Sequence, residues 1–376
     1  MYKLKDFAQD ISVAIKDVQS SPFDRFVGLE HYDSGEPVIT RYTDKSLLSS
    51  SVKEFQKNDI LIARRNVYLK RAGIAFFDGL TSGDSIVLRV YDDCESRTGI
   101  SKQDAIRIIP FILNSNAFWA YANKHADGMN SKRISKEMLY DYEFDLPPIA
   151  EQKVLADKLW AAYRLKESYK KLLAATEEMV KSQFIEMFGN PVTNNKGWNT
   201  LPIKDVAPET SSLEKQTGKV WILNLDMIES NTGKVVEKVF ENDSNLLSVA
   251  PFDEGNVLYS KLRPYLNKVV IPDGKGYATT ELVPLRPNQK LLNLTFFSHL
   301  LRGDDFVTYA NSISTGTKMP RMPLNDLRKF QCILPPMEKQ NEFEEIAHQA
   351  DKSGFELRKS IVSIDKVIKS LINENI

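Results

Sequence analysis

The 376-residue chain has only two cysteines, Cys94 and Cys332, and no run of 18 apolar residues. So few cysteines in a chain of this length predict a reducing compartment, and we interpret both as buried thiols. The missing apolar run excludes a membrane-spanning helix. The first residues, MYKLKDFAQDISVAIKD, contain acids throughout and no apolar stretch, so they do not resemble a signal peptide. We therefore expect a cytoplasmic protein without a membrane partner.

Motifs for catalysis and cofactor binding are also missing. The four histidines share no metal-ligand spacing, and neither CxxC nor HExxH occurs, so no metal site is expected. No Walker or dinucleotide-binding glycine loop is present. Gly189-Asn190-Pro191 resembles the Asn-Pro-Pro-aromatic motif of amino-methyltransferases only faintly, and we interpret it as a helix C-cap followed by a proline stop. The sequence thus predicts no catalytic residue and no cofactor in this chain.

An excess of positive charge is lacking too, because the formal net charge is zero. Proteins that bind nucleic acid are usually basic, so only the local distribution of charge can indicate such a function here. The chain is long enough for two domains, and its hydrophobic content of 42% allows each of them a core.

What the sequence does contain is a repeat. Residues 55–89 align without gaps with residues 252–286, at an offset of 197. Residues 118–152 align with residues 306–340 at an offset of 188, and both segments end in LPPxxxQ. Upstream, Leu29 corresponds to Leu225 at an offset of 196. Three blocks in the same order indicate a tandem duplication of a unit of about 190 residues.

Each repeat reads as a mixture of short strands and helices. Apolar runs bounded by polar turns predict buried strands at residues 59–63, 85–89, 256–260 and 282–285. Helical spacing of apolar residues predicts one helix over residues 110–124 and another over residues 293–310. The expected class is therefore α+β, with mixed helices and strands in both halves.

Two long helices are predicted at residues 146–189 and 334–376. Each opens with a proline pair, which suits a first helical turn, and carries an apolar stripe over about 40 residues. Such a helix is about 60 Å long, more than a small domain can cover. We expect the two to pair as an antiparallel coiled coil, the alternative being two helices lying separately on their own domains. The apolar stripe is wider than packing against one partner requires, which favours a further protein partner.

The expected domains follow from these elements. The first globular domain spans residues 1–145 and the second spans residues 190–333, with the long helices at residues 146–189 and 334–376.

Basic and polar residues gather at two matching places in each repeat. Arg, Asn and Lys side chains bind phosphate and read purine edges, while small hydroxyl residues permit close approach to a DNA backbone. A solvated surface loop is the alternative for any one cluster, but recurrence in both halves favours binding. In the first half the candidate DNA-binding residues are Arg64, Arg65, Asn66, Tyr68, Lys70, Arg71, Ser131, Lys132 and Arg133. In the second half they are Lys261, Arg263, Tyr265, Lys268, Thr315, Thr317, Lys318 and Arg321.

Over essentially its full length the chain resembles the specificity subunit of type I restriction-modification systems. The resemblance is carried by LPPIAEQ at 146–152, LPPMEKQ at 334–340, FGNP at 188–191 and KGW at 196–198. FVGLEHYDSG at 26–35 and RRNVYL at 64–69 also resemble the first recognition domain of a common subgroup.

The resemblance implies two similar target recognition domains, each reading one half of a split double-stranded DNA site. The antiparallel helices would separate the domains and dock methyltransferase (M) subunits, usually two, which restriction (R) subunits join in some complexes. S-adenosylmethionine, ATP and Mg²⁺ would then belong to partner subunits, and this chain would not be an enzyme. Helices of about 60 Å would allow half-sites up to about 17 base pairs apart.

Two functions of other classes stay open on the residues alone. One is a coiled-coil scaffold or regulator that contacts only proteins. The other is a self-contained restriction or modification enzyme, which the missing cofactor loop and catalytic motifs disfavour.

Overall fold

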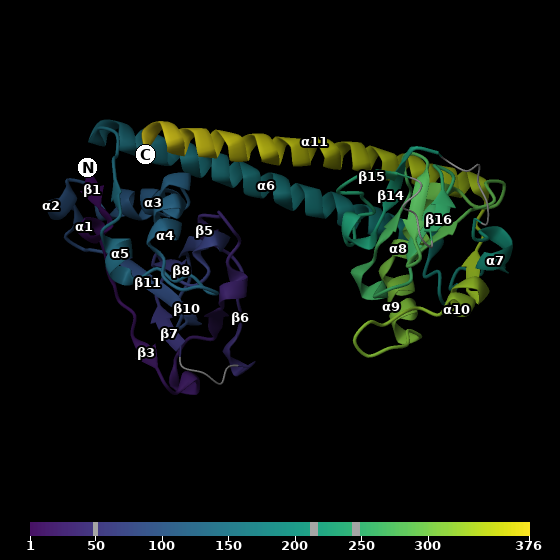
Figure 1. Ribbon diagram of the computed structural model, residues 1–376, viewed down its shortest axis with the longest axis horizontal. Helices are drawn as coiled ribbons and strands as arrows, with labels where there is room; N and C mark the ends of the chain where they lie inside the picture. Colours follow the sequence, from purple (N-terminus) through teal and green to yellow (C-terminus); the bar gives the residue numbers. More distant parts are fainter. Residues whose placement is uncertain (48–51, 211–216, 243–248) are drawn as a thin grey trace. The chain divides into compact units, whose positions relative to one another are not determined.

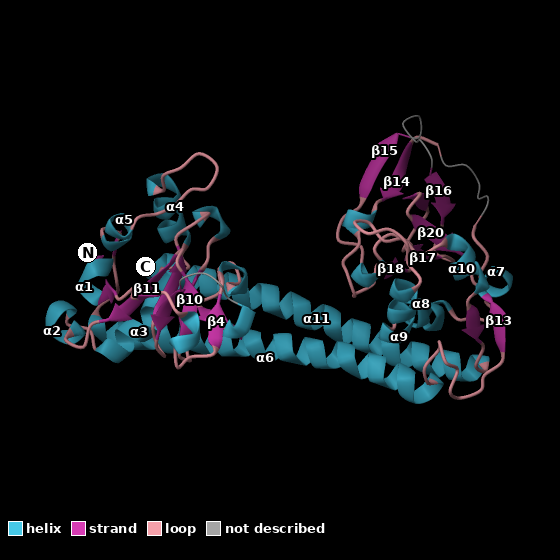
Figure 2. Ribbon diagram, turned by 90° about the horizontal axis from the view of Figure 1, so that it is seen from below, coloured by secondary structure: helices cyan, strands magenta, loops and turns pink. Residues whose placement is uncertain are grey.

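The computed structural model describes residues 1–47, 52–210, 217–242 and 249–376. They form two compact units: unit 1, of residues 1–170 with 359–376, and unit 2, of residues 171–358. Both units combine strands with helices, which confirms the expected mixed class (Figures 1 and 2). No helix of the described residues is both long enough and apolar enough to span a membrane.

Unit 1 is built on two five-stranded sheets. One has the spatial order β3 (Ala14–Ile15), β7 (Val52–Phe55), β10 (Gly79–Ser82), β4 (Arg25–Val27), β6 (Thr43–Asp44). The other has the order β2 (Ala8–Asp10), β11 (Ser85–Val90), β8 (Ile60–Ala63), β9 (Ala72–Ala75), β5 (Val38–Ile39). A short pair consists of β1 (Tyr2–Lys3) and β12 (Glu143–Phe144). The helices are α1 (Leu4–Phe7), α2 (Cys94–Thr98), α3 (Lys102–Ile112), α4 (Asn116–His125) and α5 (Lys136–Tyr140).

Unit 2 repeats this plan with fewer strands among its described residues. Its sheets have the orders β15 (Val239–Asn242), β14 (Lys219–Leu223), β19 (Gly276–Thr279), β16 (Val249–Phe252), and β18 (Val269–Val270), β17 (Val257–Ser260), β20 (Leu282–Leu285). A third pair consists of β13 (Thr200–Pro202) and β21 (Gln331–Ile333). The helices are α7 (Ile203–Val206), α8 (Leu294–Arg302), α9 (Asp304–Ser312) and α10 (Leu324–Lys329). The antiparallel pair β17–β20 matches β8–β11, as the duplication requires.

The four predicted strands are confirmed as β8, β11, β17 and β20, whose central residues are buried. Both shorter helix predictions were wrong in extent. The segment predicted at residues 110–124 is split between α3 and α4, because Ser115 accepts a hydrogen bond from the Phe118 amide and so begins a new helix. The segment at 293–310 is divided into α8 and α9 at Gly303.

The long helices α6 (Ile149–Phe188) and α11 (Met337–Asn375) begin directly after their proline pairs. Gly189 ends α6 with a φ of +74°, which confirms the expected C-cap. Each helix contributes one segment to each unit. In unit 1 the Lys166 ammonium lies 2.6 Å from Asp365, and in unit 2 the Arg358 guanidinium lies 3.1 Å from Glu177. Within each unit α6 and α11 therefore run antiparallel, in contact with one another (Figure 1).

The ion pair in unit 1 belongs to a buried cluster. Lys166 is only 6% exposed and donates to Glu36 at 2.7 Å, and Lys170 donates to the same carboxylate at 2.9 Å. Burial raises the pKa of Glu36, but the hydrogen bonds from Lys166 and Lys170 outweigh burial and hold the pKa below its usual 4.5. This carboxylate therefore joins the turn before β5 to α6 only while it is ionised.

We predict an acid-sensitive contribution of Glu36 to stability. Because its pKa is lower in the folded chain, the contribution is present above pH 4.5 and is lost as the pH falls below that value. The urea midpoint of unfolding of Glu36→Gln should therefore fall less between pH 5 and pH 3 than that of the wild type. Glu95→Gln, which removes an exposed carboxylate of unit 1, is the control. Equal pH profiles for wild type and Glu36→Gln would contradict the prediction.

The two LPPxxxQ segments end in buried glutamines that hold the start of each long helix. Gln152 donates to the Pro147 carbonyl at 2.9 Å. Gln340 donates to Pro335 and Leu291 carbonyls and accepts from the Asn293 amide at 2.9 Å. Gln340 thus joins α11 to the segment before α8.

Replacing Gln340 with alanine should destabilise unit 2 by about 1–3 kcal/mol, because it removes the buried hydrogen bond to the Pro335 carbonyl and the part-buried ones to Leu291 and Asn293. The measurement is the urea midpoint of unfolding. Gln331→Ala, at an exposed position of β21, should change the free energy of unfolding by less than about 0.5 kcal/mol. Similar midpoints for the two variants would show that Gln340 does not hold the helix start.

Candidate nucleic-acid interface

The first predicted cluster, residues 64–71, forms a turn between β8 and β9 around the 3₁₀ helix η4 (Val67–Leu69). Asn66 and Lys70 flank η4 with φ values of +54° and +51°, in the left-handed region. Val67 is buried beneath the turn, whereas Tyr68 is 58% exposed at its surface. The turn therefore presents an aromatic ring among cations.

Unit 2 builds the same turn from residues 261–268, between β17 and β18. Arg263 and Asn267 flank η7 (Pro264–Leu266) with φ values of +49° and +48°. Pro264 is buried and Tyr265 is 51% exposed. Non-glycine residues adopt this backbone only where the surrounding structure compensates for the strain. Its recurrence at matching places indicates that the shape of the turn is required in both units.

Two of the predicted DNA-binding cations also support the turn. Arg71 donates to the Leu29 carbonyl at 2.9 Å and to the Arg65 carbonyl at 2.9 Å. In unit 2 Lys268 donates to the Leu225 carbonyl at 2.6 Å, which is the corresponding contact. Burial lowers the pKa of Arg71. Both side chains are therefore committed to backbone carbonyls within their own unit.

The second predicted cluster forms a tight hairpin in each unit. The backbones of Asp127 and Arg133 exchange two hydrogen bonds, of 2.8 and 2.9 Å, and those of Thr315 and Arg321 do the same at 2.9 and 3.0 Å. Gly128 and Gly316 have φ values of +113° and +102°, which a side chain would strain. The sequence predicted a polar loop at each of these places, but not its hairpin geometry.

The turn and the hairpin meet in each unit. In unit 1 the Asn66 amide donates to the Lys132 carbonyl at 2.7 Å, and Arg65 Nε donates to Ser131 Oγ at 2.8 Å. In unit 2 the Arg263 amide donates to the Pro320 carbonyl at 2.7 Å. Two clusters distant in sequence thus become one surface. We name residues 64–71 with 127–133 basic surface 1, and residues 261–268 with 315–321 basic surface 2.

The predicted residues differ in how far they reach solvent. Those that are exposed are Arg65, Tyr68, Lys132, Arg133, Tyr265, Thr315, Thr317, Lys318 and Arg321. Those that are half-buried are Arg64, Asn66, Lys70, Arg71, Ser131, Lys261, Arg263 and Lys268. The exposed set carries the charge, ring and hydroxyl groups that could contact another molecule directly.

Beside each basic surface, and outside the residues that define it, lies an acidic residue that was not predicted. At basic surface 1 the Asp84 carboxylate lies 3.6 Å from Arg64, 3.7 Å from Arg65 and 3.6 Å from Arg133. At basic surface 2 Glu281 pairs with Arg321 at 2.9 Å, which raises the pKa of that guanidinium.

Asp84 and Glu281 lie in the turns that lead into β11 and β20. Each also accepts a backbone hydrogen bond from the first residue of its basic turn, Arg64 or Lys261. They correspond to each other at the offset of 197, so the repeat alignment contained the signal that would have found them. The candidate residues were chosen for their positive charge or polarity, so the two matching acidic residues were not identified.

Catalysis has no support in the geometry of these surfaces. Within the described residues no group of three or more His, Cys, Asp or Glu side chains could hold a metal ion. Both cysteines are buried free thiols, as expected, and burial raises the pKa of each. The arrangement is suited to binding: fixed guanidinium and ammonium groups around an exposed tyrosine can contact phosphates and base edges.

Residues 195–363 match the family model described as type I restriction modification DNA specificity domain. The specificity subunit of the type I restriction enzyme EcoDI of Escherichia coli is 25% identical over 189 residues, which cover 48% of this chain and 41% of that protein. The chain thus matches about two fifths of the length of that relative.

Two solved structures resemble the whole chain in fold. One comes from work on complex assembly and conformational transition of the type I R-M system, with 15% identity, a TM-score of 0.54, and coverage of 100% of this chain and 98% of that one. The other is a type I restriction-modification S subunit from M. genitalium, with 12% identity, a TM-score of 0.54, and coverage of 99% and 94%. The matching family model covers residues 195–363, less than half of the chain, and these two structures are similar to the whole chain in fold.

Proposed function

We propose that this chain is the DNA-recognition subunit of a type I restriction-modification complex. Basic surface 1 reads one half of a bipartite double-stranded site and basic surface 2 reads the other. The observation that carries the proposal is the recurrence, in both units, of a strained turn joined to a hairpin by the same backbone hydrogen bond. Such a rigid frame holds side chains at fixed positions, as base readout requires.

The two half-sites differ in sequence under this proposal. The backbone frames match, but Asn66 in surface 1 is replaced by Arg263 in surface 2. The hydrogen-bonded pair Arg65 and Ser131 of surface 1 is replaced by Leu262 and Met319 in surface 2. Arginine prefers guanine edges and asparagine prefers adenine edges in the major groove. Each well-formed bidentate contact to a base contributes about 1–3 kcal/mol of discrimination.

Partner subunits supply the chemistry in this proposal. Methyltransferase subunits, of which we expect two, dock on α6 and α11 and carry S-adenosylmethionine, and restriction subunits with ATP and Mg²⁺ can join them. Support comes from large apolar side chains that stay exposed along the long helices of the two units. They are Ile149, Val154, Leu165, Leu172, Met179, Ile185, Phe355, Val362 and Val367. The same side chains are what a purely protein-binding scaffold would show, so DNA readout needs its own test.

The test is co-expression with the candidate methyltransferase subunit of the same cell, followed by genome-wide mapping of methylated adenines. We expect a bipartite motif with a gap of fixed length that disappears when this chain is deleted. Replacing residues 1–145 by the corresponding part of a relative should change one half of the motif and leave the other half unaltered. A complex that forms while methylation is independent of this chain would identify it as a scaffold.

A sharper prediction concerns Asp84, which partly neutralises three arginines of basic surface 1. Asp84→Asn should release them to reach additional phosphates. The affinity for unrelated DNA should rise several-fold, the slope of log K against log salt should steepen by about one per new phosphate contact, and the preference for the cognate site should fall.

Asp92→Asn is the matched control, because it removes the same charge from an exposed residue of unit 1 that pairs only with Lys102 among the described residues. Its salt slope should equal that of the wild type. If Asp84→Asn instead weakens binding to every sequence and leaves the salt slope unchanged, Asp84 supports the fold of the turn and does not restrain the arginines.

A further inference from the structure

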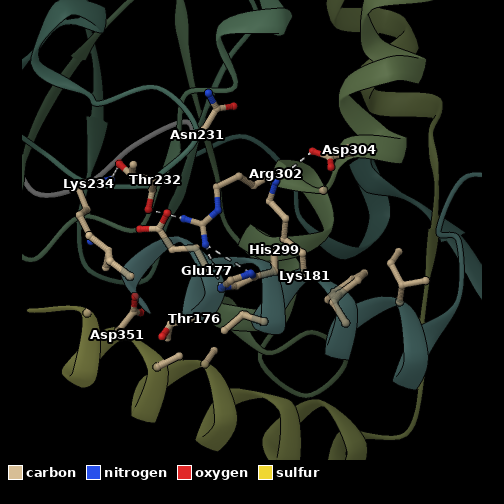
Figure 3. A pocket seen from close by; sticks show the side chains of 18 of the residues that line it. Thr176, Glu177, Lys181, Asn231, Thr232, Lys234, His299, Arg302, Asp304 and Asp351 are labelled. Atoms are coloured by element: carbon tan, nitrogen blue, oxygen red, sulfur yellow. Dashed lines mark hydrogen bonds and ion pairs between the residues drawn. The ribbon is translucent and has the colours of Figure 1, made fainter. Parts of the chain in front are cut away.

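Unit 2 contains a cavity of about 150 Å³ between α6, α8 and α11 (Figure 3). Its walls are mostly apolar, from side chains such as Leu173, Val180 and Phe184. Figure 3 shows Arg302, His299 and Thr232 gathered on one side of it. Neither basic surface contributes to this cavity, so it has no part in the DNA-reading proposal.

Comparison of the two repeats explains why the cavity exists. The glutamines 152 and 340 fix the alignment of the long helices at an offset of 188, because both donate to the carbonyl five residues earlier. By this alignment the buried Leu159 and Lys166 of unit 1 are replaced by Ala347 and Gly354 in unit 2. Unit 2 thus lacks two large side chains at this place.

At a third position the side chain in unit 2 is also smaller than its counterpart in unit 1. Gly35 and Asn231 donate to corresponding carbonyls, those of Lys70 and Asn267, so the residues that follow them, Glu36 and Thr232, are equivalent. In unit 1 the space between the recognition turn and the long helices is therefore filled by the Glu36–Lys166 ion pair. In unit 2 the equivalent space is open.

The cavity contains an arginine without a counter-ion. Arg302 lies deep in unit 2, where burial lowers its pKa. It donates to the Thr232 carbonyl at 2.9 Å and lies 2.9 Å from Nε2 of His299. Burial holds the pKa of His299 well below its usual value, so this imidazole is neutral. No carboxylate of the described residues lies within ion-pair distance of Arg302, and a buried guanidinium without one is costly.

Four acidic residues line the cavity, Glu177, Asp304, Asp305 and Asp351, and none of them forms an ion pair with Arg302 among the described contacts. Glu177 pairs with Arg358 at 3.1 Å, and Asp304 lies 3.4 Å from Lys181. Asp351 faces the same cavity; burial raises its pKa, although the positive charge of Arg302 acts in the opposite direction. Arginine has five N–H donors, of which the described contacts engage two nitrogens, and its planar fork matches a carboxylate.

We propose that this cavity binds a small organic acid, with its carboxylate on Arg302 and its hydrocarbon body in the space left by Ala347 and Gly354. A cavity of this volume with apolar walls accepts a body about the size of a benzene ring. The expected ligands are therefore monocarboxylates with about five to eight non-hydrogen atoms.

The test uses the full-length chain and 3-methylbutanoate, followed by calorimetry and by saturation-transfer NMR. The amide 3-methylbutanamide and the amine 3-methylbutylamine have the same hydrocarbon body and are the matched controls. The acid should bind at least tenfold more tightly than the amide, and the amine should bind more weakly still. Absence of binding by the acid, or equal binding of the acid and either control, overturns the proposal.

Two variants locate the site. Ala347→Leu restores the unit 1 residue and fills the cavity, and Arg302→Met removes the guanidinium; each should weaken binding of 3-methylbutanoate at least tenfold. Arg328→Met removes an arginine of unit 2 that pairs with Glu209 outside the cavity, and it should bind as the wild type does. If Arg302→Met does not fold, Ala347→Leu decides, because it removes no polar contact. Unchanged binding by Ala347→Leu would place the ligand elsewhere and refute the assignment.

Discussion

The pairing of α6 with α11 is the interaction on which both units depend. A helix of this length with an apolar stripe is not stable alone in water, because it leaves the stripe exposed. Each unit therefore closes its core with residues of both helices. In unit 1, Ile372 of α11 joins Leu155 and Leu159 of α6, and in unit 2, Phe184 of α6 contacts Phe343 of α11, with ring centroids 5.3 Å apart. Neither core is complete without a segment of each helix.

The duplicated chain keeps its backbone frame more strictly than its side chains. Corresponding hydrogen bonds join turn to hairpin in both units, and Arg71 and Lys268 hold corresponding carbonyls although they are different residue types. Side chains on the frame have diverged, as Asn66 and Arg263 show. The interiors of the two units differ as well, because the position of Lys166 in unit 1 is occupied by Gly354 in unit 2. A constant frame with variable side chains allows the two halves to acquire different ligands without a change of fold.

Much of the fold could be predicted because its signals are local. The strand β8 is a continuous apolar run, and the long helices follow proline pairs and contain little glycine. The breaks at Ser115 and Gly303 were missed because the apolar spacing continues across them. A capping hydroxyl or a glycine within an apolar pattern does not by itself reveal that the chain changes direction.

The candidate site was predicted in parts and not as an assembly. Residue type indicated which side chains could bind phosphate, but the contact of Arg65 with Ser131 depends on sheet topology, which sequence spacing does not contain. For the same reason, the contacts of Arg71 and Lys268 with backbone carbonyls could not be predicted from the sequence. Asp84 was missed because the sequence does not show that this acidic residue lies beside three arginines. Only the fold brings Arg64, Arg65 and Arg133 close to its carboxylate.

The division of α11 between the units has a consequence for synthesis on the ribosome. Residues 359–376 belong to unit 1, yet they are made after the whole of unit 2. At ordinary rates of translation, the 188 residues of unit 2 take roughly 10 to 40 seconds to emerge. During that interval Lys166 and the apolar face around Leu159 lack Asp365 and Ile372. The half of the molecule that is translated first is thus the half that is finished last, and the nascent chain exposes an unfinished helix face for that time.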